Sequence, residues 1–268
     1  IRQQILADAD REYQTYKRQV ETDKKTAPEK KPALLSEKFA AIQATLDQHK
    51  TGSRLWTLAN RYIYGTDAND RMARTSKMNM IMHGDGHGGV HHHDGFLNVN
   101  GIFEGRFDII LTNPPFGANV EASDVVHESD LTVTPEAEKR YTEEYGDLYV
   151  AAQARTHAAV GKSIASLFDL PKRSGTEKEQ AKRAETAKIK TEILFIERCL
   201  SLLKPGGRLG IVLPEGIFNN PSLAYVREFC ENRAFIRAVV SLPQETFLSS
   251  GASVKASLLF MQKFTEME

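Results

Sequence analysis

Two consecutive prolines directly follow an apolar run and limit what that run can become. Residues 107–112 read Phe-Asp-Ile-Ile-Leu-Thr, a stretch typical of a strand in a sheet that is covered on both faces. Asn113-Pro114-Pro115-Phe116 comes next. Proline has no N–H for a sheet ladder, so the strand must stop there. Open α/β sheets bind their ligands at the carboxyl ends of strands, so this tetrapeptide is the first candidate site.

The groups in this tetrapeptide suit one kind of ligand. Asn113 offers a side-chain amide, the two prolines offer rigid backbone carbonyls, and Phe116 offers an aromatic face. Two acceptors match the two hydrogens of a planar exocyclic amine, and the aromatic face can stack on the ring that carries the amine. The alternative is that Asn-Pro-Pro is only a turn that ends the strand, with Phe116 in the core.

Apolar periodicity and turn residues divide the rest of the chain into alternating strands and helices. The pattern predicts helices at residues 1–20, 34–49, 69–83, 191–203 and 222–231, and strands at 61–67, 96–99, 107–112, 208–213, 236–242 and 253–263. The last two strands are joined by a segment too short for a crossover helix, so one of them should be antiparallel. The sequence therefore predicts an α/β fold with helices on both faces of a mostly parallel sheet.

Three segments do not fit this alternation. Residues 21–32 are rich in lysine and contain two prolines, which indicates a linker or the tip of a hairpin. Residues 84–95 are rich in glycine and histidine and are predicted to form a loop. Residues 117–187 are irregular, with helical pieces near 148–168. We expect one domain over residues 1–268, with insertions at about 21–60 and 117–187.

The motifs resemble those of a known family. Residues 107–116 resemble the catalytic strand of the amino-directed DNA methyltransferases, which methylate adenine N6 with S-adenosylmethionine. Residues 204–216, Lys-Pro-Gly-Gly-Arg-Leu-Gly-Ile-Val-Leu-Pro-Glu-Gly, and residues 239–263 resemble the modification subunits of type I restriction systems. The resemblance covers about 61–116 and 190–263. It implies a Rossmann-like S-adenosylmethionine-dependent methyltransferase fold, with a mostly parallel sheet and one antiparallel closing strand.

This resemblance implies a role for each residue of the tetrapeptide. The Asn113 side-chain oxygen and the Pro114 carbonyl would hold the two hydrogens of the adenine amine, and Pro115 completes the rigid backbone. Phe116 would stack on an adenine rotated out of double-stranded DNA, because the amine cannot be reached within the base stack. Positioning and local electrostatics should dominate the catalysis, since the methyl sulfonium is already a reactive donor.

Two acids match the family's cofactor positions. Asp67 ends the predicted strand at 61–67, where an acid commonly binds ribose hydroxyls. Its alternative role is to cap the helix that follows. Asp94, within His93-Asp94-Gly95-Phe96-Leu97, resembles the family's later acidic motif near the adenine amine of the cofactor.

One expected motif is absent from the sequence. The family's first motif is a strand followed by Asp-Pro-Ala-x-Gly-x-Gly-x-Phe, and no such segment occurs here. Residues 1–20 match the helix that should follow it. We therefore expect the chain to be a fragment that lacks the first central strand and half of the cofactor cradle, and to bind cofactor poorly by itself.

Two further patterns near residues 83–93 do not predict a ligand site. Residues 84–89 formally fit G-x-G-x-x-G, but they follow a predicted helix and lead to a strand, the reverse of a dinucleotide fingerprint. Nearby histidines could coordinate zinc: His83, His87, His91, His92 and His93. No cysteine accompanies them and methyl transfer needs no metal, so we expect a mobile loop and no metal site.

Composition limits the partners and the compartment. Lys plus Arg and Asp plus Glu number 35 each, so the formal net charge is zero, whereas free-standing DNA binders are usually basic. The resemblance implies a specificity subunit, and also a restriction subunit, as partners that share the DNA contacts. Cys199 and Cys230 lie in apolar helical patterns and should pack in the core. No membrane-length apolar run or secretory signal is visible, so the cytoplasm is the expected compartment.

Two alternative functions remain open at the level of sequence. Protein-glutamine and RNA methyltransferases also use Asn-Pro-Pro-aromatic, although their usual aromatic residue is Tyr, whereas Phe116 stands here. A non-catalytic assembly module is the third interpretation, because the first cofactor motif is missing.

Overall fold

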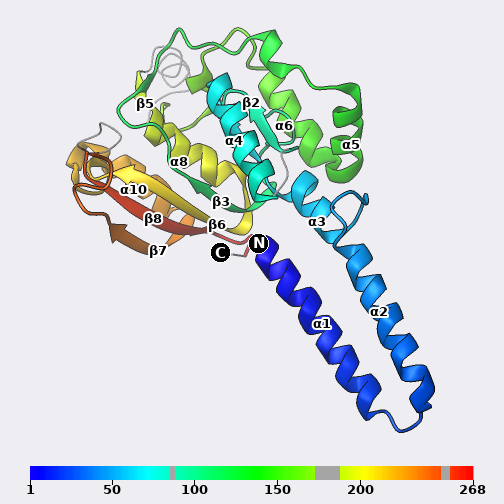
Figure 1. The fold of residues 1–268 in the computed structure, drawn as a ribbon. Coiled ribbons are helices and arrows are strands. Elements are labelled where there is room, and N and C mark those ends of the chain that lie inside the picture. The colour runs from blue at the N-terminus through cyan, green and yellow to red at the C-terminus, as the bar shows by residue number, and fades with distance from the viewer. Residues whose placement is uncertain (85–87, 173–187, 249–253, 268) are drawn as a thin grey trace. The chain divides into compact units, whose positions relative to one another are not determined.

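The computed structural model describes residues 1–84, 88–172, 188–248 and 254–267. The chain forms two compact units, residues 1–95 and 96–268 (Figure 1). Within the described part of the chain, no helix combines the length and apolar character needed to cross a membrane.

A helical hairpin opens the first unit. Helices α1 (Arg2–Thr22) and α2 (Lys31–Thr45) lie side by side, in blue in Figure 1, and the short helix η1 (Pro28–Lys30) joins them. The Tyr13 ring packs edge-on against Phe39, with 5.4 Å between ring centroids. Glu12 of α1 accepts hydrogen bonds from Lys38 of α2 and from Arg54, each at 2.7 Å. The hairpin tip expected at residues 21–32 is confirmed.

A two-stranded parallel sheet completes the first unit. After α3 (Arg54–Thr57) and η2 (Leu58–Tyr62), β1 (Gly65–Asp67) pairs with β2 (Val90–His92), and α4 (Asp70–His83) connects them. The predicted strand at 61–67 is thus shorter than expected, because η2 takes its first residues. The prediction that residues 84–95 form only a loop is wrong, since β2 lies within them.

Glycine explains the strand that the sequence pattern missed. A Cβ added at Gly89 would lie 2.0 Å from the Ile63 carbonyl oxygen, so only glycine lets the two backbones approach this closely. The helix between the strands is as predicted. Its first turn is capped by Asn69, whose side chain accepts from the Met72 N–H at 3.2 Å, and it ends at Gly84.

The second unit is built on a four-stranded sheet in the order β3-β6-β8-β7. These strands are β3 (Phe107–Thr112), β6 (Leu203–Pro214), β8 (Ala256–Lys263) and β7 (Ala234–Ser241). β3 and β6 are parallel, and β8 is antiparallel to both β6 and β7. The predicted antiparallel closing strand is therefore confirmed. β3, β6 and β7 all run in one direction.

Two sequence-based predictions in the second unit are wrong in detail. Residues 96–99 form no strand, and their only ladder contact is an isolated bridge between Val99 and Ile102. The strand predicted at 208–213 begins earlier, because β6 directly follows α8 (Thr191–Leu202). Lys204-Pro-Gly-Gly lies inside β6, where the register with β3 shifts between Phe107 and Ile109.

Short elements occur within and directly after residues 117–187, the region that the sequence describes only as irregular. They are β4 (Asn119–Val120), η3 (Glu128–Leu131), α5 (Pro135–Tyr145), α6 (Asp147–His157), η4 (Ile164–Leu167) and β5 (Ile189–Lys190). Helix α6 and η4 fall within the helical pieces predicted at 148–168, whereas α5 was not predicted. Residues 173–187 of this region lie outside the described residues. Three further helical turns follow β6: α9 (Gly216–Asn219), η5 (Pro221–Leu223) and α10 (Ala224–Glu231).

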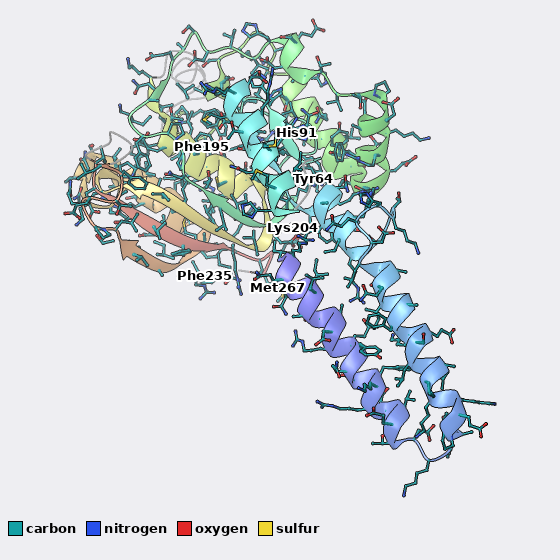
Figure 2. The ribbon with its side chains drawn as sticks, viewed as in Figure 1. Tyr64, His91, Phe195, Lys204, Phe235 and Met267 are labelled. Carbon is teal, nitrogen blue, oxygen red and sulfur yellow. The ribbon has the colours of Figure 1, made fainter. Side chains whose placement is uncertain are left out.

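One continuous apolar core holds the second unit together. Its members include Leu209, Ile211 and Leu213 of β6, Leu259 and Met261 of β8, Ile196 and Leu200 of α8, and Val226 of α10. Phe195 of α8, labelled in Figure 2, packs against Phe96 with 4.5 Å between ring centroids. Cys199 and Cys230 are buried here as predicted, and burial raises the pKa of each thiol to about 12.

The opposite face of this sheet is more open than predicted. Ile109 and Leu111 of β3 are 64% and 77% exposed, although the apolar run indicated a strand covered on both faces. Gly210 of β6 lies beside Leu111, so no side chain from that strand covers it. On the other face of β3, Ile110 is partly buried against the apolar core of the second unit.

Buried charges fix the loops that α8 covers. The Arg198 guanidinium is fully buried and donates to Asn98 Oδ1 at 2.7 Å and to the Leu97 carbonyl at 2.6 Å. The Asn98 amide in turn donates to the Ala152 carbonyl of α6 at 3.0 Å. Arg198 therefore ties α8, the 97–98 segment and α6 together.

Glu197, the residue before Arg198 in α8, fixes a second loop. Its carboxylate accepts from the backbone N–H groups of Asp169 and Leu170 at 2.7 and 2.8 Å. Burial raises the pKa of Glu197, and these two hydrogen bonds oppose that rise.

We predict that Arg198→Met lowers the free energy of unfolding by about 3 kcal/mol, because the acceptors on Asn98 and Leu97 lose a charged donor inside the core. Arg155→Met is the matched control. Arg155 pairs with Glu104 at 2.9 Å but its side chain is 58% exposed, so its loss should cost less than about 1 kcal/mol. Urea unfolding of both variants measures the difference. Equal losses would contradict the role given to Arg198.

Candidate active site

The predicted acceptor tetrapeptide lies at the carboxyl end of β3. Asn113 is exposed, Pro114 is buried, Pro115 is exposed and Phe116 is half-buried. The Asn113 side chain makes no hydrogen bond to any residue that the structure describes. A buried proline next to an exposed amide gives a rigid support for a side chain that is open to a ligand.

The chain beyond the tetrapeptide is clamped at three points. Gly117 adopts φ +76°, a left-handed conformation that suits glycine, and its carbonyl accepts from Lys190 Nζ at 2.9 Å. The Ala118 carbonyl accepts from the Thr191 N–H at 3.1 Å, at the first residue of α8. β4 then pairs with β5. These contacts fix the position of residues 113–116 against the start of α8.

The structure adds an aromatic residue that the sequence did not single out. Phe247 lies in the loop after β7, and its ring meets Phe116 edge-on with 6.1 Å between centroids and 89° between planes. The two residues are far apart in the chain. They can meet because β3 and β7 run in the same direction, so the segments that follow them leave the sheet at the same end, the carboxyl end of these strands. This end of the sheet is called its edge below.

A carboxylate stands at the same edge, after β6. Glu215 is half-buried, and its Oε2 accepts from the buried Ser257 hydroxyl at 3.0 Å. Its backbone N–H donates to the Lys255 carbonyl at 2.9 Å. The sequence displays Glu215 within Leu-Pro-Glu-Gly, but only the strand directions reveal that it shares an edge with Asn113.

The first unit repeats this arrangement with the two predicted acids. Asp67 is the last residue of β1, and Asp94 follows the end of β2 by two residues. The two strands are parallel neighbours, with Asp67 opposite His92, so both acids lie at one sheet edge. Asp67 Oδ1 accepts from the Asn69 N–H at 2.8 Å. Asn69, rather than Asp67, caps α4.

A cavity adjoins Asp67 within the first unit. Its volume is about 380 Å³, and its lining includes Tyr64, Thr66, Asp67, Ser76 and Asn79. Ile63, Met80 and Val90 also line it, so a mostly apolar cavity carries a few hydroxyl, amide and carboxylate groups, as small-molecule sites commonly do.

The structure describes part of the glycine pattern at residues 84–89 and most of the histidines near it. Gly84 ends α4 and Gly89 permits the close approach of β1 and β2, while residues 85–87 lie outside the described part. His92 Nε2 lies 3.1 Å from the Ala68 carbonyl oxygen. No group of three or more His, Cys, Asp or Glu residues able to hold a metal occurs among the residues that the structure describes.

The family model described as N-6 DNA Methylase matches residues 37–155 and 169–268. The match takes in most of the sequence, and the chain belongs to the N-6 DNA Methylase family. It also extends into the segments 21–60 and 117–187, which the motifs alone left uncovered. No curated protein matches the chain.

The solved structures that match the chain are only distantly related to it in sequence. A chain of a type I restriction–modification system matches with 22% identity and a TM-score of 0.49, covering 85% of this chain and 35% of that one. The M protein of the type I restriction enzyme EcoKI matches with 18% identity and a TM-score of 0.48, covering 87% and 37%. A Vibrio vulnificus YJ016 chain, assigned as the modification subunit of a type I restriction enzyme, matches with 20% identity and a TM-score of 0.49, covering 85% and 37%. The chain thus spans about a third of their lengths.

The family implies S-adenosylmethionine as cofactor, and the first unit carries groups that fit it. Asp67 uses one carboxylate oxygen for Asn69, and its other oxygen has no hydrogen-bond partner among the described residues. An acceptor of this kind at the wall of a cavity suits the hydroxyls of a ribose. Asp94, the second acid predicted for the cofactor site, follows β2 at the same end of this small sheet.

Proposed function

We propose that the protein is a site-specific DNA methyltransferase that transfers a methyl group to adenine N6 of a base rotated out of the duplex. We further propose that it acts as the modification subunit of a restriction–modification or related phage-defence system. The observation that carries the proposal is the rigid Asn113-Pro114-Pro115-Phe116 segment at the carboxyl end of β3. Its amide is open and its aromatic ring is supported by Phe247.

Each residue of the segment has a task in this reaction. The Asn113 side-chain oxygen and the Pro114 carbonyl accept the two hydrogens of the amine, which turns the nitrogen lone pair out of conjugation with the ring. Phe116 stacks on the extrahelical base, and Phe247 holds the Phe116 ring from the side. Bound S-adenosylmethionine supplies the methyl group. Asp67 accepts from ribose hydroxyls, and Asp94 lies near the adenine end of the cofactor.

The partners follow from the same proposal. The substrate is double-stranded DNA, and a formal net charge of zero favours shared contacts over binding by this chain alone. A specificity subunit supplies the sequence readout, and a restriction subunit is a further partner.

The direct test uses the full-length gene product with labelled S-adenosylmethionine and three acceptors: unmethylated plasmid DNA, RNA and a glutamine-containing release factor. We expect label in DNA, recovered as N6-methyladenine after digestion to nucleosides. Label in RNA or protein instead would establish one of the alternative functions. Absence of transfer and of cofactor binding would favour an assembly module.

We predict that Asn113→Ala lowers the rate of methyl transfer by about 10²–10³-fold, because the amine loses one of its two acceptors. The free energy of unfolding should change by less than about 0.5 kcal/mol, since Asn113 is exposed and has no described hydrogen-bond partner. Single-turnover kinetics and urea unfolding measure the two effects. Asn219→Ala, at the exposed end of α9, is the control and should retain full activity.

We predict that Phe116→Ala weakens capture of the extrahelical base by about 1–3 kcal/mol, the usual value of one stacked base. Phe116→Trp should retain most of it, and Phe247→Ala should have a smaller effect of the same sign. Fluorescence of 2-aminopurine at the target position reports base rotation. Phe235→Ala removes a ring that packs on Phe264 instead and should leave the signal unchanged. Loss of the 2-aminopurine signal in Phe235→Ala but not in Phe116→Ala would contradict the stacking role of Phe116.

We predict that Asp67→Ala raises the dissociation constant for S-adenosylmethionine by about 10–100-fold, because hydrogen bonds to a charged acceptor contribute about 1.5–3 kcal/mol. Calorimetric titration of the full-length protein measures it. Asp70→Ala is the control, because Asp70 pairs with Arg74 on the surface of α4. Similar dissociation constants for both variants would remove Asp67 from the cofactor site.

A further inference from the structure

The proposed methylation leaves a proton to be removed. When the amine nitrogen gains a methyl group it carries a positive charge, and it must lose one hydrogen as a proton to become the neutral N6-methyl amine. Asn113 and Pro114 offer only amide oxygens, which hold hydrogen bonds but do not retain a proton near neutral pH. A group with a suitable pKa has to lie close to the edge where the amine is held.

Glu215 is the one ionisable side chain in residues 112–120 and 213–220, the segments that follow the neighbouring strands β3 and β6. The loop after β7 carries Glu245, but this side chain is exposed. β3 and β6 are parallel neighbours, with Thr112 opposite Ile211, so both segments leave the sheet in the same direction. The carboxylate therefore belongs to the same sheet edge as Asn113 and Pro114.

The way Glu215 is held leaves one of its oxygens available. Oε2 accepts from the Ser257 hydroxyl at 3.0 Å, and Ser257 is only 2% exposed, so this side of the carboxylate is fixed. Oε1 has no hydrogen-bond partner among the described residues, and the side chain is half-buried rather than sealed. A carboxylate that is oriented by one oxygen and open at the other can take up a proton and release it to solvent.

The charged groups on neighbouring elements do not neutralise this carboxylate. Lys255 precedes β8 and contacts Glu215 through its backbone carbonyl, while its side chain is exposed. Arg227 of α10 donates to the carbonyls of Ile217 and Asn220 at 2.9 and 3.0 Å. Neither cation forms an ion pair with Glu215 in the described structure.

We propose that Glu215 accepts the proton that the methylated amine releases, directly or through one water; this inference rests on the proposed adenine methylation. The N–H bond breaks and its electron pair stays on nitrogen, which restores the lone pair of the neutral amine. The proton forms an O–H bond with Glu215 Oε1. The resulting acid returns to the carboxylate by giving its proton to solvent, so the residue is ready for another turnover.

The test compares full-length wild type with Glu215→Gln in single-turnover methylation of DNA between pH 5 and 9. We expect the wild-type rate to fall at acidic pH, because a protonated acid cannot accept a proton, which gives the pH–rate profile an inflection. Glu215→Gln should be slower by about 100-fold at neutral pH and should lack that inflection. Its affinity for DNA and its 2-aminopurine signal should equal those of wild type, since glutamine keeps the size of the side chain.

Three further variants sharpen the result. Ser257→Ala should lower the rate, because the carboxylate loses the hydroxyl hydrogen bond that orients it. Glu245→Gln, in the exposed loop after β7, is the control and should behave as wild type. If Glu215→Gln folds poorly, Glu215→Ala with added formate replaces it, and rate recovery that saturates with formate is the expected outcome.

The outcomes separate this inference from the proposed function. A wild type that methylates DNA, with Glu215→Gln matching its rate and its pH inflection, would overturn the role of Glu215 and leave the proposed function intact. The same holds if Glu215→Gln loses only DNA affinity and keeps the inflection. A wild type that transfers no methyl group to DNA would overturn the proposed function itself.

Discussion

The common direction of β3, β6 and β7 is the constraint on which the candidate site depends. Each strand ends at the same sheet edge, and β8 makes this possible by running antiparallel between β6 and β7. Asn113, Glu215 and Phe247 follow these three strands in turn. About a hundred residues separate Asn113 from Glu215, and about thirty separate Glu215 from Phe247. The common strand direction nevertheless places all three at the same end of the sheet. The first unit uses the same rule with β1 and β2, which deliver Asp67 and Asp94.

Local signals were enough to predict the elements whose ends are fixed by their own residues. Asn69 and Gly84 mark α4 because a cap and a left-handed stop act within one turn of the helix. Asn113-Pro114-Pro115 marks the end of β3 for the same reason. β2 was missed because three residues flanked by glycine and histidine carry no periodic pattern, and only the approach of Gly89 to Ile63 makes them a strand.

Features that depend on distant residues could not be derived in this way. The apolar run of β3 indicated cover on both faces, but exposure of Ile109 and Leu111 is set by what packs on the sheet, not by the run itself. The aromatic contact between Phe116 and Phe247 depends on the order of strands in the sheet. Sequence motifs were therefore enough to predict Asn113, Asp67 and Asp94 as candidate site residues. Glu215 and Phe247 were missed, because only the topology of the sheet brings them to the candidate site.

The choice of an amide at position 113 connects these observations. A neutral oxygen acceptor is well suited to orient an amine, because it draws both hydrogens into fixed directions without capturing either of them. The same neutrality prevents it from removing the proton that the reaction must release. Orientation and proton removal are therefore separate tasks that call for separate groups. A half-buried Glu215, oriented by Ser257 and placed by β6 beside β3, provides the second group without placing a negative charge at the position of Asn113.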